Sequence, residues 1–276
     1  MIARLPRLHA VTDDRVVAAG TVVPRAAAMA AAAGSALAVQ LRTRTLPGGE
    51  LLALARRLRE VLAPHGSWLV VNDRVDVARA AGADAVALGR SGLEVRDARR
   101  VAPDLPVARA VHDAAEARAA EGEGADFLVA GAVYATPSHP AAPPAGPALV
   151  GAAAAGGRQV IAIGGLTPAN AAGAIGAGAW GVAAIRALWD AADPAEAVRA
   201  FLAVLPAAGA VAVAVNGESR AVPTGTTLRG LLEQLGLDPR AVVVEHNRRI
   251  VRRDGLAQVV LAGGDAIELV HFVGGG

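Results

Sequence analysis

The 276-residue sequence contains no cysteine and no lysine, and aromatic residues make up only 3% of it. Without cysteine, the chain has no disulfide, no thiolate nucleophile and no cysteine-ligated zinc. Without lysine, it has neither Schiff-base chemistry nor a lysine that could bind a phosphate group. These two absences exclude several classes of enzyme mechanism before any motif is considered.

The sequence also lacks a large net charge of either sign. All 27 basic residues are arginines, and the formal net charge is only +2. The sequence pI of 10.2 reflects the lack of groups that titrate between neutral pH and the arginine range, so it does not indicate a basic patch for nucleic acid. We therefore expect no nucleic-acid partner.

Unbroken apolar runs of membrane-spanning length are missing as well. The uncharged stretch 26–41 is too short to cross a bilayer, and the stretch 159–185 is interrupted by Gly164-Gly165 and Pro168. The first residues, MIARLPRLHAVTDDR, carry charges throughout and do not resemble a signal peptide. We expect a cytoplasmic protein without a membrane partner.

What is present is an alternation of short Val/Ile/Leu runs with segments of helical periodicity. Eight strands are predicted, at RLHAVT, LAVQL, WLVV, AVAL, PVARA, DFLVAG, QVIAIGG and GVAAI. Helices are expected at 50–62, 74–81, 114–121, 169–176 and 194–205. This order predicts an α/β domain, a (β/α)8 TIM barrel, over residues 1–206.

The pattern changes after residues 206–210. The stretch VAVAVNGESRAV alternates apolar and polar residues about Asn216-Gly217, which is typical of a type I′ hairpin. An amphipathic helix follows at 227–237, and strands are expected at AVVVEHN and AIELVHF. We predict a second, small α+β domain over residues 211–276.

This second domain resembles ThiS, the ubiquitin-like sulfur carrier of thiamine biosynthesis, which has a β-grasp fold. The resemblance rests on VNGE (215–218), TLRGLLEQLGL (227–237), VVVEHNRRIVRRD (242–254) and GDAIELVHFVGGG (264–276). It implies that an adenylating, sulfur-transferring enzyme activates the terminal carboxylate of Gly276, which Gly275 precedes. It also implies that the resulting thiocarboxylate delivers sulfur to thiazole synthase. The alternative for the three terminal glycines is an ordinary frayed end.

The barrel resembles the thiamine phosphate synthase superfamily. The matching segments are VQLRTR (39–44), VNDRVDVA (71–78), LGRSGLEV (88–95), YATPSHP (134–140) and VIAIGGLTPAN (160–170), each where a strand is expected to end. The resemblance implies a thiazole phosphate substrate and a glycine pair, Gly164-Gly165, that offers N–H groups to the phosphate. The other substrate-binding residues that it implies are Gln40, Arg42, Arg44, Asn72, Thr136, Ser138 and Arg186.

One branch of that superfamily, thiamine phosphate synthase itself, binds magnesium through two aspartates. Asp73 matches the first of them, but Gly92 stands in place of the second. Ala110 replaces the catalytic-loop serine of that branch, and His139 replaces its lysine in Thr-Pro-Thr-Lys. These departures leave the pyrophosphate leaving group poorly stabilised, and so they argue against synthase activity.

The other branch, the TenI-like thiazole tautomerases, has the pattern Gly-Arg-Ser-Val-His on the fifth strand, where this chain has Ala108 to His112. The resemblance implies that His112 moves protons to aromatise a thiazole carboxylate phosphate, for which an imidazole is suited near neutral pH. The alternative is a buried structural histidine. Arg186 takes the place of a serine after strand eight and either binds the phosphate or points to solvent.

The leading hypothesis is therefore a thiazole tautomerase that needs no cofactor, fused to a sulfur carrier. The second hypothesis is a thiamine phosphate synthase, which would need magnesium at Asp73. The third is a barrel without catalysis that serves as a platform for the carrier. Thiazole synthase itself is excluded, because it depends on a lysine imine. The sequence leaves a homo-oligomer open.

Overall fold

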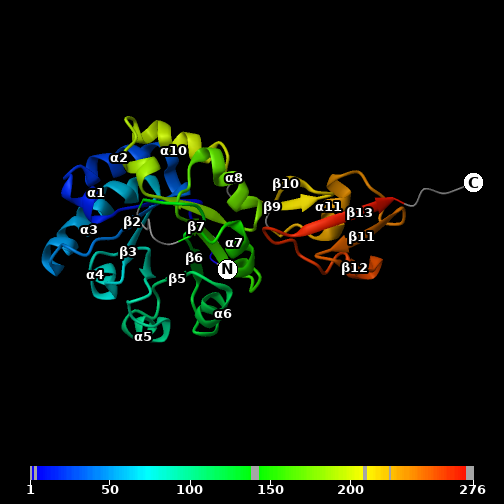
Figure 1. The fold of residues 1–276 in the computed structure, drawn as a ribbon, viewed down its shortest axis with the longest axis horizontal. Coiled ribbons are helices and arrows are strands. Elements are labelled where there is room, and N and C mark those ends of the chain that lie inside the picture. Colours follow the sequence, from blue (N-terminus) through cyan, green and yellow to red (C-terminus); the bar gives the residue numbers. More distant parts are fainter. Residues whose placement is uncertain (1, 3–4, 138–142, 208–209, 224, 272–276) are drawn as a thin grey trace, which may run out of the picture.

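The computed structural model describes all residues except 1, 3–4, 138–142, 208–209, 224 and 272–276. It contains two sheets, each with its own apolar core. Figure 1 shows the larger, helix-wrapped unit at one end and the smaller unit at the other. The predicted combination of a TIM barrel with a small β-grasp domain is confirmed.

The larger unit is a closed parallel barrel in which each strand pairs with the next and β8 returns to β1. The strands are β1 (Leu8–Val11), β2 (Leu37–Leu41), β3 (Trp68–Asn72), β4 (Ala85–Leu88), β5 (Val107–Val111), β6 (Phe127–Ala130), β7 (Gln159–Ile163) and β8 (Gly181–Ala184). Almost all of their residues are buried, which explains why they form continuous apolar runs in the sequence. All eight correspond to the predicted strands.

Alternate residues of each barrel strand face the interior. Ala38, Val70 and Ala108 belong to the cluster that fills the barrel, together with Phe127 and Ile161. Because the side-chain period of a strand is two, the residues two positions further along these strands, Gln40, Asn72 and Ala110, face the same way. This alternation sets which polar residues reach the open end of the barrel.

The barrel helices are α1 (Asp14–Ala18), α2 (Val22–Ala33), α3 (Gly48–Leu62), α4 (Val75–Ala80), α5 (Val95–Val101), α6 (Ala114–Gly122), α7 (Pro147–Ala154), α8 (Pro168–Gly176), α9 (Arg186–Trp189) and α10 (Pro194–Leu202). Asp113 and Asp193 cap α6 and α10 by accepting hydrogen bonds from two N–H groups each. Helices α1, α2, α5, α7 and α9 were not predicted. In the described residues, no helix is long and apolar enough to span a membrane.

The smaller unit is a five-stranded sheet in the order β10-β9-β13-β11-β12, packed on helix α11 (Leu228–Gln234). Its strands are β9 (Ala210–Val215), β10 (Glu218–Pro223), β11 (Val242–His246), β12 (Arg249–Val251) and β13 (Ala266–His271). Asn216 and Gly217 have φ values of 50° and 81°. Both are positive, as a type I′ hairpin requires, so the predicted turn between β9 and β10 is confirmed.

Candidate functional site

Polar side chains gather at the carboxyl ends of the barrel strands, which form the mouth of the barrel. Gln40 on β2 and Asn72 on β3 face inward by the alternation described above, and the Gln40 amide donates a 2.7 Å hydrogen bond to Asn72 Oδ1. In a TIM barrel the loops at this end hold the reacting groups. The two amides therefore form one preorganised polar wall of the mouth.

The loop after β2 places two arginines at the mouth. Thr12 Oγ1 donates to the carbonyl of Arg42 and accepts from its N–H, both at 2.8 Å, and Asp14 accepts a 2.7 Å hydrogen bond from the Arg44 N–H. These contacts fix the backbone and leave the side chains available. Among the described residues, neither guanidinium has a carboxylate within ion-pair distance, so both can bind an anion.

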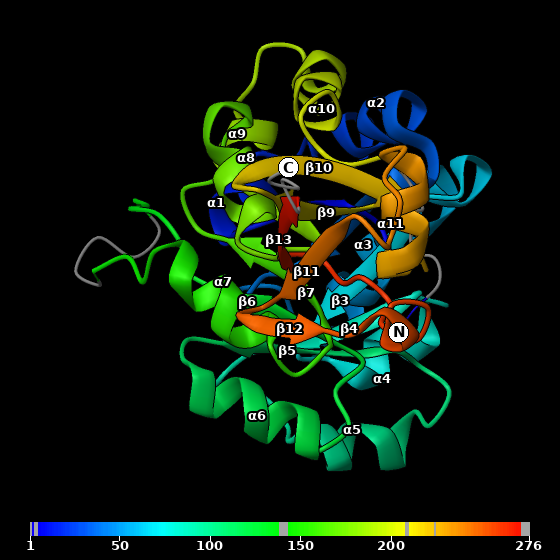
Figure 2. The ribbon, with the colours of Figure 1, turned by 90° about the vertical axis from the view of Figure 1, so that its right-hand side faces the viewer.

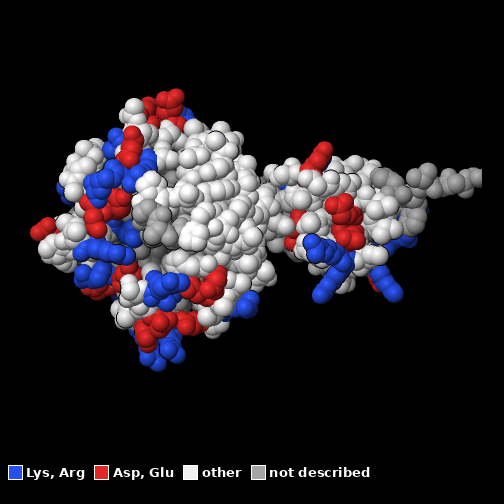
Figure 3. All heavy atoms as spheres, viewed as in Figure 1, with Lys and Arg blue, Asp and Glu red and all other residues white. Residues whose placement is uncertain are grey.

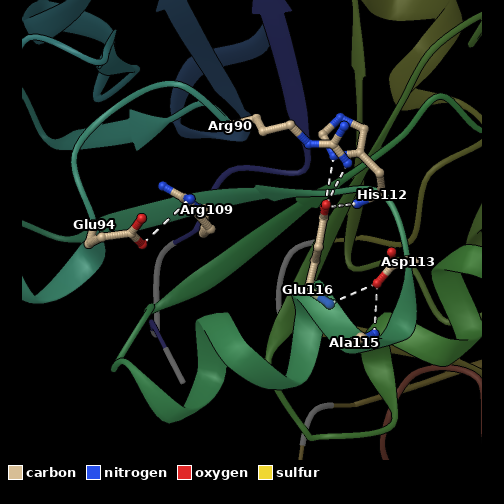
Figure 4. A network of polar contacts seen from close by, with 7 residues as sticks. All are labelled: Arg90, Glu94, Arg109, His112, Asp113, Ala115 and Glu116. Atoms are coloured by element: carbon tan, nitrogen blue, oxygen red, sulfur yellow. Dashed lines mark hydrogen bonds and ion pairs between the residues drawn. The ribbon is translucent and has the colours of Figure 1, made fainter.

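His112 follows β5 and lies at the mouth on the inward side of that strand. Glu116, one turn into α6, accepts two hydrogen bonds from it through Oε2: from the backbone N–H at 2.8 Å and from Nδ1 at 2.9 Å. Arg90 donates to the other oxygen of Glu116. Figure 4 shows the three side chains meeting, with Asp113 capping the helix that carries Glu116.

The electrostatics of this cluster follow from its hydrogen bonds. Partial burial raises the pKa of Glu116, but hydrogen bonds from His112 and Arg90 outweigh that effect and lower the pKa to about 2. Glu116 is therefore ionised at neutral pH, and an ionised carboxylate can only accept from Nδ1. The proton of a neutral His112 is held on Nδ1, which leaves Nε2 free to act as a base.

The imidazole of His112 is accessible to solvent. Its side chain is 43% exposed, so the alternative of a buried structural histidine is wrong. His9, by contrast, is fully buried inside the barrel on β1, and burial lowers its pKa to about 4. Its complete burial makes His9 part of the barrel core rather than of the mouth.

The turn after β7 requires glycine at two positions. Gly164 and Gly165 have φ values of 102° and 64°, which favour glycine. A Cβ at Gly164 would lie 2.6 Å from Ala132 Cβ, and one at Gly165 would lie 2.4 Å from the Ala135 carbonyl oxygen. Within the described part of the chain, the N–H groups of both glycines have no hydrogen-bond acceptor. They are thus available to an anion.

The remaining sequence-predicted residues lie as follows. Thr136 is half-buried in the loop after β6, and Arg186 is exposed at the start of α9, after β8. Ser138, His139, Gly275 and Gly276 lie outside the described residues. On the face seen in Figure 3, charged side chains gather on the half of the barrel away from the smaller unit, whereas the half beside it is almost uncharged.

Asp73 adopts a conformation that does not suit a two-carboxylate magnesium site. Its φ is 57°, and its Oδ1 accepts a 2.7 Å hydrogen bond from the N–H of Gly89. A Cβ at Gly92 would lie only 2.4 Å from that same oxygen, so a carboxylate at position 92 would require Asp73 to move. Among the described residues, no group of three or more His, Asp or Glu side chains is placed to hold a metal ion.

The family of the barrel follows from comparison with known proteins. The model of the family described as thiamine monophosphate synthase, TMP-TENI, matches residues 8–188. The chain belongs to this family. Residues 213–276 match the ThiS family model, so the smaller unit is a ThiS family domain. Both domains therefore belong to families of thiamine biosynthesis.

Several relatives align with the barrel. A thiamine-phosphate synthase of Methanoculleus marisnigri is 42% identical over 197 residues, which are 70% of this chain and 92% of that protein. A bifunctional protein ThiM/ThiE of Symbiobacterium thermophilum is 48% identical over 167 residues, 59% of this chain but only 35% of that longer protein. A solved structure, thiamine phosphate pyrophosphorylase of Pyrococcus furiosus, has a TM-score of 0.64 and 31% identity over 72% of this chain and 94% of its own.

Two residues of the site were missed in the sequence. Glu116 stands four positions after His112, the spacing at which helical side chains meet, and Asp113 between them marks a helix start. That signal could have identified Glu116. Arg90 carries no such signal, because it comes from the loop after β4 and reaches Glu116 only in the folded barrel.

Proposed function

We propose that the barrel binds a thiazole carboxylate phosphate and aromatises it by moving a proton, as a thiazole tautomerase does. The observation that carries this proposal is the pair formed by His112 and Glu116 at the mouth. A single imidazole with a defined tautomer is sufficient for a proton shift between two positions of one molecule. The reaction needs no cofactor.

In this mechanism, Nε2 of His112 takes the proton from the ring carbon, and the electron pair moves into the developing aromatic system. The imidazolium that forms is stabilised by the ionised Glu116 at 2.9 Å from Nδ1. The imidazolium then returns a proton to the second position. Arg90 holds Glu116 in place, so Arg90 acts on the histidine only through the carboxylate.

The phosphate of the substrate would bind at the turn after β7. The N–H groups of Gly164 and Gly165, both without an acceptor within the described chain, support this placement. We propose that Arg186, which is exposed at the start of α9 after the neighbouring strand β8, adds a positive charge. The amides of Gln40 and Asn72 and the guanidinium groups of Arg42 and Arg44 would then orient the rest of the substrate.

A second candidate is thiamine phosphate synthase, and the names of the relatives favour it over the tautomerase. The proteins of M. marisnigri and P. furiosus that align over most of their length are both named for that reaction or its pyrophosphate chemistry. Against it stand the lack of lysine in the whole chain and the glycine at position 92. The carboxylates here do not fit the magnesium that a synthase uses, so we derive no step through a metal.

For the ThiS domain, we propose sulfur transport on the C-terminal glycine. On an activating enzyme, the carboxylate of Gly276 would attack the α-phosphorus of ATP, which gives an acyl adenylate and releases pyrophosphate. Sulfide would then displace AMP and leave a thiocarboxylate. The match of residues 213–276 to the ThiS family supports this proposal. Thiazole synthase is the expected acceptor of the sulfur.

The test of the barrel proposal is a product assay with the purified protein. In one reaction it receives the thiazole carboxylate phosphate tautomer. In the other it receives pyrimidine diphosphate, thiazole phosphate and magnesium. We expect aromatic thiazole from the first and no thiamine phosphate from the second above the uncatalysed rate. If thiamine phosphate forms without aromatisation, the barrel is a synthase and not a tautomerase. If neither product forms, the hypothesis of a non-catalytic platform is favoured.

A further inference from the structure

The two domains are joined by a contact that buries a charged side chain. Arg7, which precedes β1, is only 4% exposed, and its guanidinium carbon lies 3.6 Å from the ring centre of Trp180. The same guanidinium donates to the carbonyls of Trp180 and of Ala210, the first residue of β9. One side chain of the barrel therefore binds both the barrel and the ThiS domain.

The rest of the joint is apolar and close-packed. Trp180 packs against the core of the ThiS domain as well as the cluster that fills the barrel, and its Nε1 donates to the Leu5 carbonyl at 2.9 Å. A Cβ at Gly264 would lie 2.7 Å from the Cα of Gly178. Such close backbone approach across the joint leaves no room for a second orientation with the same contacts.

Burial of the Arg7 charge favours the joined arrangement of the two domains over a separated one. Burial lowers the pKa of Arg7 to about 10, so the group stays charged at neutral pH. Among the described residues, no carboxylate pairs with it, and the two carbonyls and the indole face are its partners. Separation of the domains with Arg7 still in the barrel would remove the Ala210 carbonyl from a charged donor. A loosely tethered pair of domains would not need such a contact.

The joint lies at the end of the barrel opposite to the mouth. Arg7 comes directly before β1 and Trp180 directly before β8, so both mark the amino ends of the strands. His112, Gln40 and Gly164 lie at or just beyond the carboxyl ends of theirs. The ThiS domain is thus fixed to the floor of the barrel, and the mouth opens on the other side.

The last described strand of the chain leads away from the barrel. β13 runs parallel to β9, which begins at the joint, and Figures 1 and 2 show β13 pointing outward from the barrel. From Ala266 to His271 the chain advances five residues along β13, or about 17 Å at the usual rise of a strand. The five further residues to Gly276 span at most about 18 Å. Residue 276 cannot reach back to the mouth while the joint is intact.

We infer that the joint formed by Arg7 and Trp180 holds the carrier terminus and the barrel mouth at opposite ends of the molecule. The two domains of one chain therefore never act on the same substrate molecule at once. This inference rests on the proposed function. The partner that takes sulfur from the carrier is a separate polypeptide, and what it makes reaches a barrel mouth only after release into solution. The fusion therefore fixes the stoichiometry of the two domains without channelling between them.

A distance measurement tests the geometry independently of any activity. The chain has no native cysteine, so Gly49→Cys and Val270→Cys together give two unique spin-label sites. A Cβ at Gly49 meets nothing within 4 Å, and Val270 is 61% exposed. Gly49 is the second residue of helix α3, which begins near the mouth and runs for 15 residues, about 22 Å, and β13 adds about 20 Å beyond the floor. We expect one narrow distribution near about 40 Å.

The same double-labelled chain with Arg7→Ala should give a broader distribution, whereas Arg15→Ala, which removes an exposed ion pair with Asp190, should leave it narrow. A substantial population below about 20 Å in the chain with native Arg7 would overturn the inference. So would a broad distribution in that chain, because the domains would then be free to turn toward each other.

Isotope dilution tests the claim that no intermediate is channelled between the two domains. The full chain, its activating enzyme and thiazole synthase are supplied with labelled precursors, and unlabelled tautomer is added in excess. We expect the aromatic product to lose label in proportion to the added tautomer. Retention of label would show channelling and overturn the inference. If no aromatic product forms at all, the proposed function fails, while the spin-label distance still decides the geometry.

Discussion

The two ends of the barrel use their polar groups in opposite ways. At the floor, the Arg7 guanidinium and the Trp180 indole nitrogen are buried, and carbonyls accept hydrogen bonds from both Arg7 Nη atoms and from the indole, whereas Arg7 Nε has no partner among the described residues. At the mouth, His112, Arg42 and the Gly164 turn are held in place through part of their hydrogen-bonding groups, and the rest remain open. The difference agrees with a floor that holds the ThiS domain and supports our proposal that the mouth binds a ligand, although both ends are built from the same eight strands.

The largest expected effect is at neither end of the barrel but at the carrier terminus. Deletion of Gly275 and Gly276 should abolish thiocarboxylate formation, because the carboxylate would no longer reach the activating site. Intact mass shows the conversion as a gain of about 16 Da when sulfur replaces oxygen. Aromatisation by the barrel should continue unchanged. A truncated chain that still gains sulfur would contradict the role of these glycines.

At the mouth, His112→Ala should slow aromatisation by about 10²–10⁴-fold, the usual contribution of a general acid–base group. The protein should fold normally, because the side chain is 43% exposed. His65→Ala is the matched control, since His65 is exposed outside the mouth in the turn after α3. Wild-type rates for the His112 variant would show that the imidazole takes no part in the reaction.

At the floor, Arg7→Ala should lower the free energy of unfolding by about 2 kcal/mol, because it removes a cation–π contact and two hydrogen bonds to buried carbonyls. Arg15→Ala should cost less than about 1 kcal/mol, as exposed ion pairs usually do. Urea unfolding followed by far-UV circular dichroism measures both. Equal effects would mean that burial of the Arg7 charge adds nothing to stability.

These contrasts show how far the sequence alone could go. The eight strands were predictable because each is buried on both faces and reads as an apolar run. Helix α5 has a charged sequence without a clear stripe, and α7 lies in an Ala/Gly/Pro-rich segment typical of turns, so neither was predicted. Arg7 and Trp180 are 173 residues apart, and nothing local in the sequence marks them as partners.

The candidate site shows the same limit. Its strand-end residues, such as Gln40 and His112, were predicted because a resemblance and the barrel topology both place them at the mouth. The residues that pair with them and fix their orientation were not predicted. Arg90 is brought to Glu116 by the fold, and the overlap of Asp73 with the position of a Gly92 side chain depends on loop geometry. Local sequence patterns identify the functional side chains, and only the folded structure gives the distances between them.

The smallest expected effect is a pH dependence at the mouth. The folded protein lowers the pKa of Glu116 from 4.5 to about 2, so ionisation of Glu116 stabilises the fold above pH 4.5. That contribution is lost as the pH falls through about 2. The stability difference between the native chain and Glu116→Gln should shrink as the pH falls from 4.5 to 2. Glu60→Gln, at an exposed site on α3, should show no such trend, and the same trend there would contradict the assignment.

The most direct test of proton transfer at the mouth is aromatisation in D2O, followed by proton NMR. We expect the imidazolium of His112 to exchange with solvent before it returns a proton, because its side chain is 43% exposed. We predict aromatic thiazole that carries solvent deuterium at the position that receives the proton, formed by the native chain and not by His112→Ala. Product formed at the same rate by both chains, or product without deuterium, would contradict the assignment of His112 as a solvent-exchanging acid–base group.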